Sequence, residues 1–325
     1  ARRAVRLFRH TDDLPADARG AVMALGNFDG VHRGHQAVIG EAQRIARSLG
    51  VPAGVVTFEP HPRRVFRPDE PPFRLSPFRV KARKLESLGL DLLVVCHFDG
   101  GFQHKTADAF VREDLVGGLA IRHAVCGSDF LFGHRRGGDV ALLTRLGDDL
   151  GFGVTVVGPV ADPEGGVYSS TRVRDALLAG RAGDAAHILG TPWEIEGRVE
   201  HGDKLGRTIG FPTANIELGE YLRPAFGVYA VRAGVDAGAA PVWHAGVANL
   251  GRRPTVGGLI ERLEVDQFDL AGDLYGRHLR VQFVEHLRGE QKFDGLDALK
   301  AQIARDGDAA RVALAAPSAL PSTTL

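Results

Sequence analysis

The stretch GNFDGVHRGH, residues 26–35, decides the fold. It follows the apolar run AVMAL (21–25) and leads into HQAVIGEAQRIARSLG (35–50), in which Val38 and Ala42 share one helical face. A strand, a glycine-rich loop and an amphipathic helix in this order predict a parallel α/β unit. The glycines allow backbone N–H groups to approach a ligand at the positive end of the helix. The stretch therefore predicts a phosphate-binding loop; the alternative is a plain glycine turn with two exposed histidines.

The same alternation of strand and helix continues to about residue 160. Near-continuous apolar strands separated by amphipathic helices predict a doubly wound parallel sheet covered on both faces. We expect strands at 51–58, 90–98, 121–127 and 154–160, and helices at 79–89, 106–119 and 138–151. Ligands of such sheets bind beyond the carboxyl ends of the strands. We therefore expect the loops 26–35, 59–64, 127–138 and 168–174 in one neighbourhood.

The pattern changes after about residue 190, where short period-2 segments alternate with turn residues. These segments predict an antiparallel β-barrel closed by one helix at 294–306. The expected strands lie at 193–200, 226–232, 241–250, 262–270 and 278–287. The predicted domains are 1–186 and 187–315, followed by a disordered Pro/Ser/Thr-rich tail at 316–325.

Composition narrows the class of partner. Lys plus Arg and Asp plus Glu both number 40, so the formal net charge is zero, which argues against a nucleic-acid or membrane-surface binder. The two cysteines, Cys96 and Cys126, lie in apolar runs without a partner at metal-ligand spacing. We expect small-molecule partners, a cytoplasmic protein, and a monomer or weak homo-oligomer.

A second segment, YSSTRVR (168–174), supports an anion site. Its hydroxyls precede a predicted helix, and two arginines occupy the first turn of that helix, where positive charge is unfavourable unless an anion is present. A helix cap explains one hydroxyl, and a surface salt bridge is the alternative for the arginines. The predicted polyphosphate contacts are Ser169, Ser170, Thr171, Arg172 and Arg174.

In the second half, HGDKLGRTIGFPTANIEL (201–218) combines glycines with cations. Gly202 and Gly206, with Lys204 and Arg207, predict a phosphate flap.

Thr213 and Asn215 follow the flap and are two residues apart, so they face one side of an extended segment. Their hydroxyl and amide oxygens suit Mg²⁺ with ATP. The alternative is that both side chains satisfy a turn.

These segments carry a family resemblance. GNFDGVHRGH and YSSTRVR resemble the two signatures of the nucleotidylyltransferase superfamily. Two further segments narrow the resemblance within that superfamily, TFEPHPRRVF (57–66) and GSDFLFGHRRGGD (127–139). Together they resemble the adenylyltransferase half of bacterial bifunctional riboflavin kinase/FAD synthetases over nearly all of residues 21–190. The resemblance implies transfer of AMP from ATP to FMN, which gives FAD and pyrophosphate.

The resemblance also implies roles for individual residues. His32 and His35 would hold and polarise ATP phosphates, and Arg174 would grip the triphosphate or the leaving pyrophosphate. The loop residues expected to line the nucleotide are Gly26, Asn27, Phe28, Asp29, Gly30 and Gly34, with Asp29 equally a turn residue. The expected flavin contacts are His61, Asp129 and Phe130; His61 equally shapes a rigid loop, and Phe130 is equally a core residue.

The segment GFPTAN (210–215) is similar to the signature of riboflavin kinases, and the likeness extends over about residues 190–312. It implies transfer of the ATP γ-phosphate to the riboflavin 5′-hydroxyl. Glu264 matches the family's catalytic glutamate, which takes the hydroxyl proton; the alternative is a solvent-facing strand residue. Alternation places Asp266 on the same face, where many relatives carry histidine.

The leading hypothesis is thus a bifunctional enzyme that makes FMN and then FAD. A second hypothesis keeps only one active half. A third, a non-catalytic flavin-binding sensor, would tolerate loss of the HxGH element or of Glu264, and this sequence retains both.

Overall fold

The computed structural model describes residues 4–200, 213–238, 241–255, 258–268 and 274–316. Contacts divide the chain into two compact units. The first comprises Ala1–Pro71 and Phe78–Tyr168; the second comprises Pro72–Pro77 and Ser169–Leu325. The short segment 72–77 therefore belongs with the second unit, although its flanks on both sides belong to the first.

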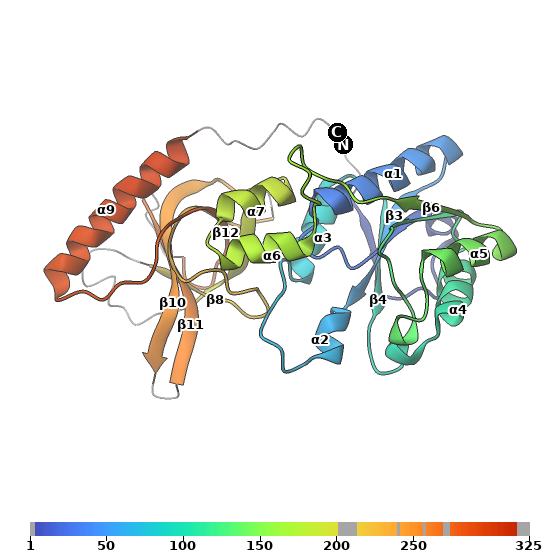
Figure 1. Ribbon diagram of the computed structural model, residues 1–325, viewed down its shortest axis with the longest axis horizontal. Helices are drawn as coiled ribbons and strands as arrows, with labels where there is room; N and C mark the ends of the chain where they lie inside the picture. The colour runs from blue at the N-terminus through green and yellow to red at the C-terminus, as the bar shows by residue number, and fades with distance from the viewer. Residues whose placement is uncertain (1–3, 201–212, 239–240, 256–257, 269–273, 317–325) are drawn as a thin grey trace. The chain divides into compact units, whose positions relative to one another are not determined.

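The first unit is built on a parallel sheet, as the sequence predicts (Figure 1). Within the described residues its strand order is β1-β4-β3-β2-β5-β6, and every pairing is parallel. The strands are β1 (Arg6–Phe8), β2 (Val22–Leu25), β3 (Ala53–Glu59), β4 (Leu92–His97), β5 (His123–Gly127) and β6 (Gly153–Val157).

The order of the strands fixes where a ligand can bind. The chain moves outward from β2 through β3 to β4 and then returns to place β5 on the other side of β2. Ligands of open α/β sheets bind at such a reversal, beyond the carboxyl ends of the strands. The residues that follow β2 and β5, 26–32 and 128–139, flank this point. The fold thus brings GNFDGVH and the GSDFLFG loop to one edge of the sheet.

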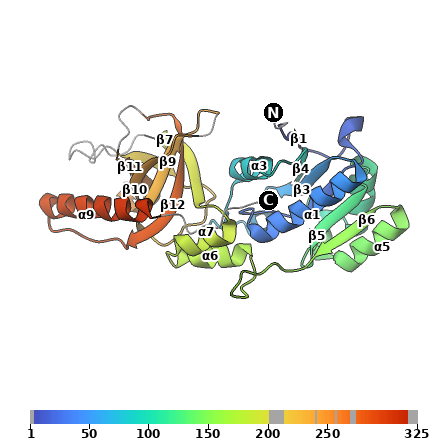
Figure 2. The same cartoon turned by 90° about the horizontal axis from the view of Figure 1, so that it is seen from above.

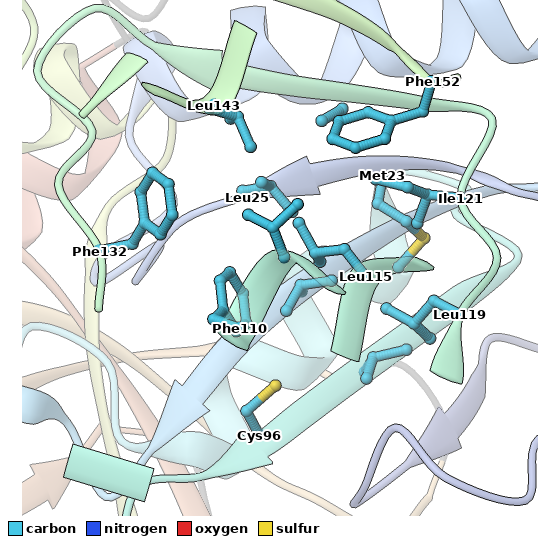
Figure 3. Packing of buried hydrophobic residues seen from close by; sticks show 14 of the residues in the cluster. Met23, Leu25, Cys96, Phe110, Leu115, Leu119, Ile121, Phe132, Leu143 and Phe152 are labelled. Carbon is cyan, nitrogen blue, oxygen red and sulfur yellow. The ribbon is translucent and has the colours of Figure 1, made fainter. Parts of the chain in front are cut away.

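Helices cover both faces of this sheet. They are α1 (Arg33–Leu49), α2 (Pro62–Phe66), α3 (Phe78–Ser87), α4 (Ala107–Ala109), the π-helical η3 (Phe110–Gly118) and α5 (Val140–Leu150), with short 3₁₀ turns η1 (Ala16–Ala18), η2 (Phe102–His104) and η4 (His134–Arg136). One core lies under α1 and α3. The other lies under α4, η3 and α5 (Figure 3).

The alternation of β2 shows how each strand serves both cores. Val22 and Ala24 belong to the α1 side, whereas Met23 and Leu25 belong to the side shown in Figure 3. Successive residues of a strand point to opposite faces, and both faces are dry here. This explains why the strands read as continuous apolar runs in the sequence.

The second unit contains a closed antiparallel barrel in the order β10-β11-β8-β7-β12-β9 (Figure 2). Its strands are β7 (Trp193–Glu200), β8 (Ala214–Glu217), β9 (Gly227–Val235), β10 (His244–Thr255), β11 (Gly258–Gln267) and β12 (His278–Arg288). Helix α9 (Leu296–Ala315) packs on β9, β10 and β12. Helices α6 (Ser170–Leu178) and α7 (Ala182–Leu189) pack on each other, and α7 contacts β7 and β12.

Several elements differ from the prediction. β1 was missed because a three-residue edge strand carries too little period-2 signal. The predicted helix at 106–119 begins at the expected cap, Thr106, whose Oγ1 accepts a hydrogen bond from Ala109 N at 3.1 Å, but most of it is π-helical. β8 lies in a segment for which the sequence predicts an extended backbone but no named strand.

Candidate functional site

The loop after β2 is buried and has an unusual backbone. Phe28 and Val31 have φ angles of 51° and 52°, and Gly30 lies between them at 86°. Positive φ is uncommon outside glycine and a genuine outlier for β-branched valine. Both side chains are nearly inaccessible, with 1% and 3% of their surface exposed. Such strain persists only where the surroundings over-determine it, and it concentrates at functional sites.

Two glycines of this loop lie in close contact with their neighbours. The ring of Phe28 lies 3.1 Å from where a Cβ on Gly26 would stand. A Cβ on Gly34 would stand 2.9 Å from the carbonyl oxygen of Tyr168. Tyr168 immediately precedes the hydroxyl residues of the YSSTRVR segment in the chain.

The two histidines form a stacked pair at the start of α1. Their ring centroids are 3.6 Å apart with an interplanar angle of 23°. His32 is buried, with 6% of its surface exposed, and His35 is partly buried, so the alternative of a plain glycine turn with two exposed histidines does not apply. His32 caps α1, because its Nδ1 accepts a hydrogen bond from His35 N at 3.3 Å. In the neutral ring this places the proton on Nε2.

The loop after β5 presents an exposed acid and a pair of stacked rings. Asp129 is exposed, and Phe130 stacks on Phe132 with centroids 5.4 Å apart and 15° between the planes. Phe132 is a core residue, whereas Phe130 is only partly buried. Arg135 and Arg136 have φ angles of 52° and 56°, so this loop carries backbone strain as well.

Sequence reasoning missed the aromatic cluster behind this loop. Phe132 contacts Phe110, which contacts Phe58 and Phe102, with centroids about 6 Å apart. These rings come from β3, η2 and η3 and converge only in the fold. Each is an ordinary apolar residue in its own segment, so no signal in the sequence singles them out. Together they give Phe130 a rigid aromatic base.

His61, a predicted ligand contact, is a buried capping residue. It caps the five-residue helix α2, and its Nδ1 accepts a hydrogen bond from Arg63 N at 3.1 Å. Only 8% of its surface is exposed. A histidine that caps this helix helps to shape the loop, and the flavin contact expected at His61 stays a prediction.

In the second unit, residues 169–174 of the YSSTRVR segment form the cap and first turn of α6. Ser169 caps this helix, since its Oγ accepts a hydrogen bond from Arg172 N at 3.2 Å. Ser170 is partly buried and Thr171 is exposed. Arg174 is held by Phe73 of the 72–77 segment: its Nε donates to the Phe73 carbonyl at 2.9 Å, and the guanidinium carbon lies 5.6 Å from the ring centroid.

In the barrel, β11 and β8 are antiparallel neighbours, and Glu264 of β11 pairs in register with Asn215 of β8. Asn249 of β10 opposes Glu264 from the other side. Leu263 and Val265, which alternate with Glu264, have at most 1% of their surface exposed and fill the barrel. The polar row therefore lies on the outer face, where opposed side chains stand about 5 Å apart.

The predicted metal ligands lie at the end of this row. Asn215 has 6% of its surface exposed, and its Nδ2 lies 3.5 Å from the carbonyl oxygen of Thr213. The amide oxygen then points away from that carbonyl. Of the expected flap contacts, Gly202, Lys204, Gly206 and Arg207 lie outside the described residues.

Asp266 lies two residues beyond Glu264 on the same face. Burial raises the pKa of its carboxyl to about 6, and the Arg311 charge acts in the opposite direction. Arg311 belongs to α9 and lies over the ring of Phe268, 4.3 Å from its centroid. The ionisation of Asp266 therefore falls close to neutral pH.

A separate group in the barrel has the spacing of metal ligands. Among the described residues, ligand atoms of Glu196, Asp236 and His278 lie within 4.8 Å of one another. His278 Nε2 lies 3.4 Å from Glu196 Oε1. Arg280, which is paired with a further acid, adds positive charge to this region. These acids already have cationic neighbours, so we assign no metal here.

Comparison with known proteins identifies the two halves. A family model described as FAD synthetase matches residues 14–172, and one described as riboflavin kinase matches residues 189–314. The chain is 46% identical to the bifunctional riboflavin kinase/FMN adenylyltransferase of Escherichia coli (strain K12), over 94% of this chain and 97% of that protein. It is 45% identical to the protein of the same name from Pseudomonas fluorescens, over 97% and 99%.

A solved structure agrees in fold. A crystal structure from Streptococcus pneumoniae, described as a macrolide-efflux protein, superposes with a TM-score of 0.83 at 31% identity and covers 95% of this chain and 99% of its own. The description as a macrolide-efflux protein belongs to the Streptococcus pneumoniae structure and is not carried over to this chain. In the part of this chain that the structure describes, no helix is long and apolar enough to cross a membrane.

The two family models cover the chain in succession, and the bifunctional relatives match it almost end to end. The chain belongs to the family of bifunctional riboflavin kinase/FMN adenylyltransferases.

Proposed function

We propose that the two reactions of this bifunctional riboflavin kinase and FMN adenylyltransferase occur at two separate sites. Adenylyl transfer uses the loop 26–35 with residues 169–174, and phosphoryl transfer uses the outer face of the barrel around Glu264. The observation that carries the first assignment is the strained, buried loop at the switch point of the sheet. The second rests on Glu264 opposite Asn215.

In the kinase step, Glu264 accepts the proton of the riboflavin 5′-hydroxyl as its oxygen attacks the γ-phosphorus of ATP. ADP leaves, and FMN is formed. The strand position of Glu264 suits a general base, because its neighbours in the strand are packed in the barrel and hold the carboxylate in place. The flap residues 202–207 would cover the phosphates.

Thr213 and Asn215 are proposed to hold Mg²⁺ with ATP. A hydroxyl and an amide oxygen are hard ligands, and the arrangement of Asn215, with its Nδ2 toward Thr213 O, directs the amide oxygen away from that carbonyl. When bound, the ion would neutralise charge on the β- and γ-phosphates. Thr213→Ala should weaken Mg²⁺ activation of the kinase, which a titration of the FMN-forming rate against Mg²⁺ measures.

In the adenylyl transfer, the FMN phosphate attacks the α-phosphorus of ATP in line, and pyrophosphate leaves. No proton transfer is needed, so the protein acts by positioning and by stabilising charge. Nε2 of His32 and the ring of His35 are proposed to donate to ATP phosphate oxygens. Arg174 is proposed to bind the leaving pyrophosphate, and its anchoring on Phe73 would preorganise it.

The remaining assignments follow from the same sites. Asp129 and Phe130 are proposed to contact the flavin, since the aromatic cluster supports Phe130 from behind. We propose a monomer or a weak homo-oligomer. A cytoplasmic protein without nucleic-acid partners fits two buried free cysteines and zero net charge.

The test is the conversion of riboflavin by the purified chain with ATP and Mg²⁺, followed by chromatography of the flavins over time. FMN should appear first and FAD second. FMN without FAD would leave only the kinase half active, and no product would favour the flavin-binding sensor.

A further inference from the structure

A buried lysine lies directly beneath the loop 26–35. Lys81, in the first turns of α3, has no exposed surface. Its Nζ lies 2.6 Å from Oε1 of Glu59, whose side chain is 16% exposed. A fully buried lysine is rare unless it is paired. The ion pair with Glu59 explains how a buried ammonium is tolerated. It does not explain why a charged side chain stands at this position.

The ammonium makes two further contacts that reach the loop. It lies 3.1 Å from Thr57 Oγ1 and 3.2 Å from the carbonyl oxygen of Asn27. The Thr57 hydroxyl donates to the same carbonyl at 3.1 Å. An ammonium has three N–H donors, and Glu59, Thr57 and Asn27 supply three acceptors. Lys81 and Thr57 thus clamp one backbone carbonyl together.

That carbonyl lies where the loop begins to be strained. Asn27 immediately precedes Phe28, the first of the residues with positive φ, and Val31 follows three residues later. Each such conformation costs on the order of 1–3 kcal/mol and needs support from the surrounding structure. The side chain of Asn27 is exposed, so its backbone is the part that the fold holds.

Stability alone does not require a lysine here. A buried ion pair is often no more stabilising than apolar residues of similar volume. Methionine nearly matches lysine in length and would pack on the same face of α3 as Leu85. Methionine cannot donate to the Asn27 carbonyl. The contact with the loop is therefore what the ammonium adds.

We propose that Lys81 is a positioning residue for the adenylyl transfer. Its ammonium contacts the Asn27 carbonyl directly and also through the Thr57 hydroxyl. These contacts fix the carbonyl and so hold the loop that presents His32 and His35. The proposal rests on the proposed role of that loop in ATP binding. The reaction itself does not involve Lys81, which lies behind the loop and has no exposed surface.

The test compares Lys81→Met with the double variant Lys81→Met/Glu59→Gln in the full chain. The single variant leaves Glu59 without its ammonium, so the fold is weakened as well as the loop. The double variant also neutralises Glu59 but still lacks the donor to Asn27. The measurements are kcat and KM for FMN adenylylation, the kinase rate, and hydrogen exchange of the β3 backbone.

We expect Lys81→Met to lower kcat for FAD formation by about 10- to 100-fold, with KM for FMN changed by less than about threefold. The kinase rate of the same chain should be unchanged. Exchange of β3 should be faster in Lys81→Met and should return toward the wild-type rate in the double variant, while FAD formation stays low. Recovery of FAD formation together with β3 protection would show that Lys81 only stabilises the fold, and a wild-type rate in Lys81→Met would also overturn the proposal.

Two further variants complete the design. Lys105→Met removes another paired lysine of this unit, whose Nζ lies 2.7 Å from Oδ2 of buried Asp114. This variant should change the protection of backbone amides from hydrogen exchange without lowering FAD formation more than about threefold. His32→Ala/His35→Ala tests the loop itself. If it leaves FAD formation intact, the proposed role of the loop is wrong. If it removes FAD formation and Lys81→Met does not, only the proposal for Lys81 fails.

Discussion

Replacement of Gly34 by alanine tests whether close packing at the start of α1 sets the geometry of the adenylyltransferase site. The added Cβ would stand 2.9 Å from the Tyr168 carbonyl oxygen and 3.1 Å from Cε1 and Nδ1 of His32. An ordinary contact begins at 3.4 Å, so the backbone carbonyl must retreat by about 0.5 Å or the helix must shift. Either movement displaces the two histidines from their positions at the start of α1.

The magnitudes follow from these distances. Overpacking costs about 1–3 kcal/mol, and alanine regains about 1 kcal/mol of helix propensity, so the free energy of unfolding should fall by at most about 2 kcal/mol. The catalytic effect should be larger, because a misplacement approaching 1 Å costs up to about 100-fold in rate. We expect FAD formation from FMN and ATP to fall by about 10- to 100-fold, while FMN formation from riboflavin is unchanged.

Gly40 provides the matched control in the same helix. A Cβ at Gly40 would meet no atom within 4 Å, so Gly40→Ala should stabilise the protein by up to about 1 kcal/mol and leave both rates unchanged. The assay is chromatography of FMN and FAD, with urea denaturation to measure stability. Wild-type FAD formation by Gly34→Ala, or an equal loss in Gly40→Ala, would refute the reasoning.

Three other outcomes are expected. Burial raises the pKa of Asp266 to about 6, whereas the unfolded chain loses this proton near pH 4. The free energy of unfolding therefore falls as the pH rises from about 4 to about 6. Asp266→Asn should therefore add roughly 1–2 kcal/mol of stability at pH 7.5 and little at pH 4, allowing for partial exposure, and urea titrations at the two pH values check it. Arg280→Met leaves buried Glu194 without its bidentate partner and should lower the free energy of unfolding by about 3–5 kcal/mol, which Glu194→Gln should largely restore. Burial raises the pKa of the Cys126 thiol to about 11 and also raises that of Cys96, so iodoacetamide at pH 8 should label neither until urea unfolds the chain.

The sequence predicts most of the fold because its local signals agree with the tertiary structure. The helix at 35–50 ends at Gly50, which has the left-handed φ of 66° typical of such caps. Strand β10 ends later than predicted, because it extends to Thr255 through a stretch rich in arginine, glycine and proline. The π-helical character of η3 follows from packing of the whole segment and leaves no local signal.

The candidate site is predicted only where its residues lie in one segment. HxGH and GFPTAN are contiguous and therefore visible in the sequence. The strain at Phe28 and Val31 is invisible there, because neither residue type favours positive φ. Lys81 leaves a faint signal, since a lysine four residues before Leu85 falls on the apolar face of α3. Its partners come from β3 and from the loop after β2, which only the fold brings together.

The central claim is that each reaction belongs to its own site, and one product analysis tests it most directly. Riboflavin, ATP and Mg²⁺ are given to wild type, to His32→Ala/His35→Ala and to Glu264→Ala, and Glu264→Ala is also given FMN. We predict that the histidine variant accumulates FMN without FAD. Glu264→Ala should lose FMN formation by about 10²- to 10⁴-fold yet convert added FMN to FAD at the wild-type rate. Loss of both activities in either variant, with the fold intact, would contradict the two-site account.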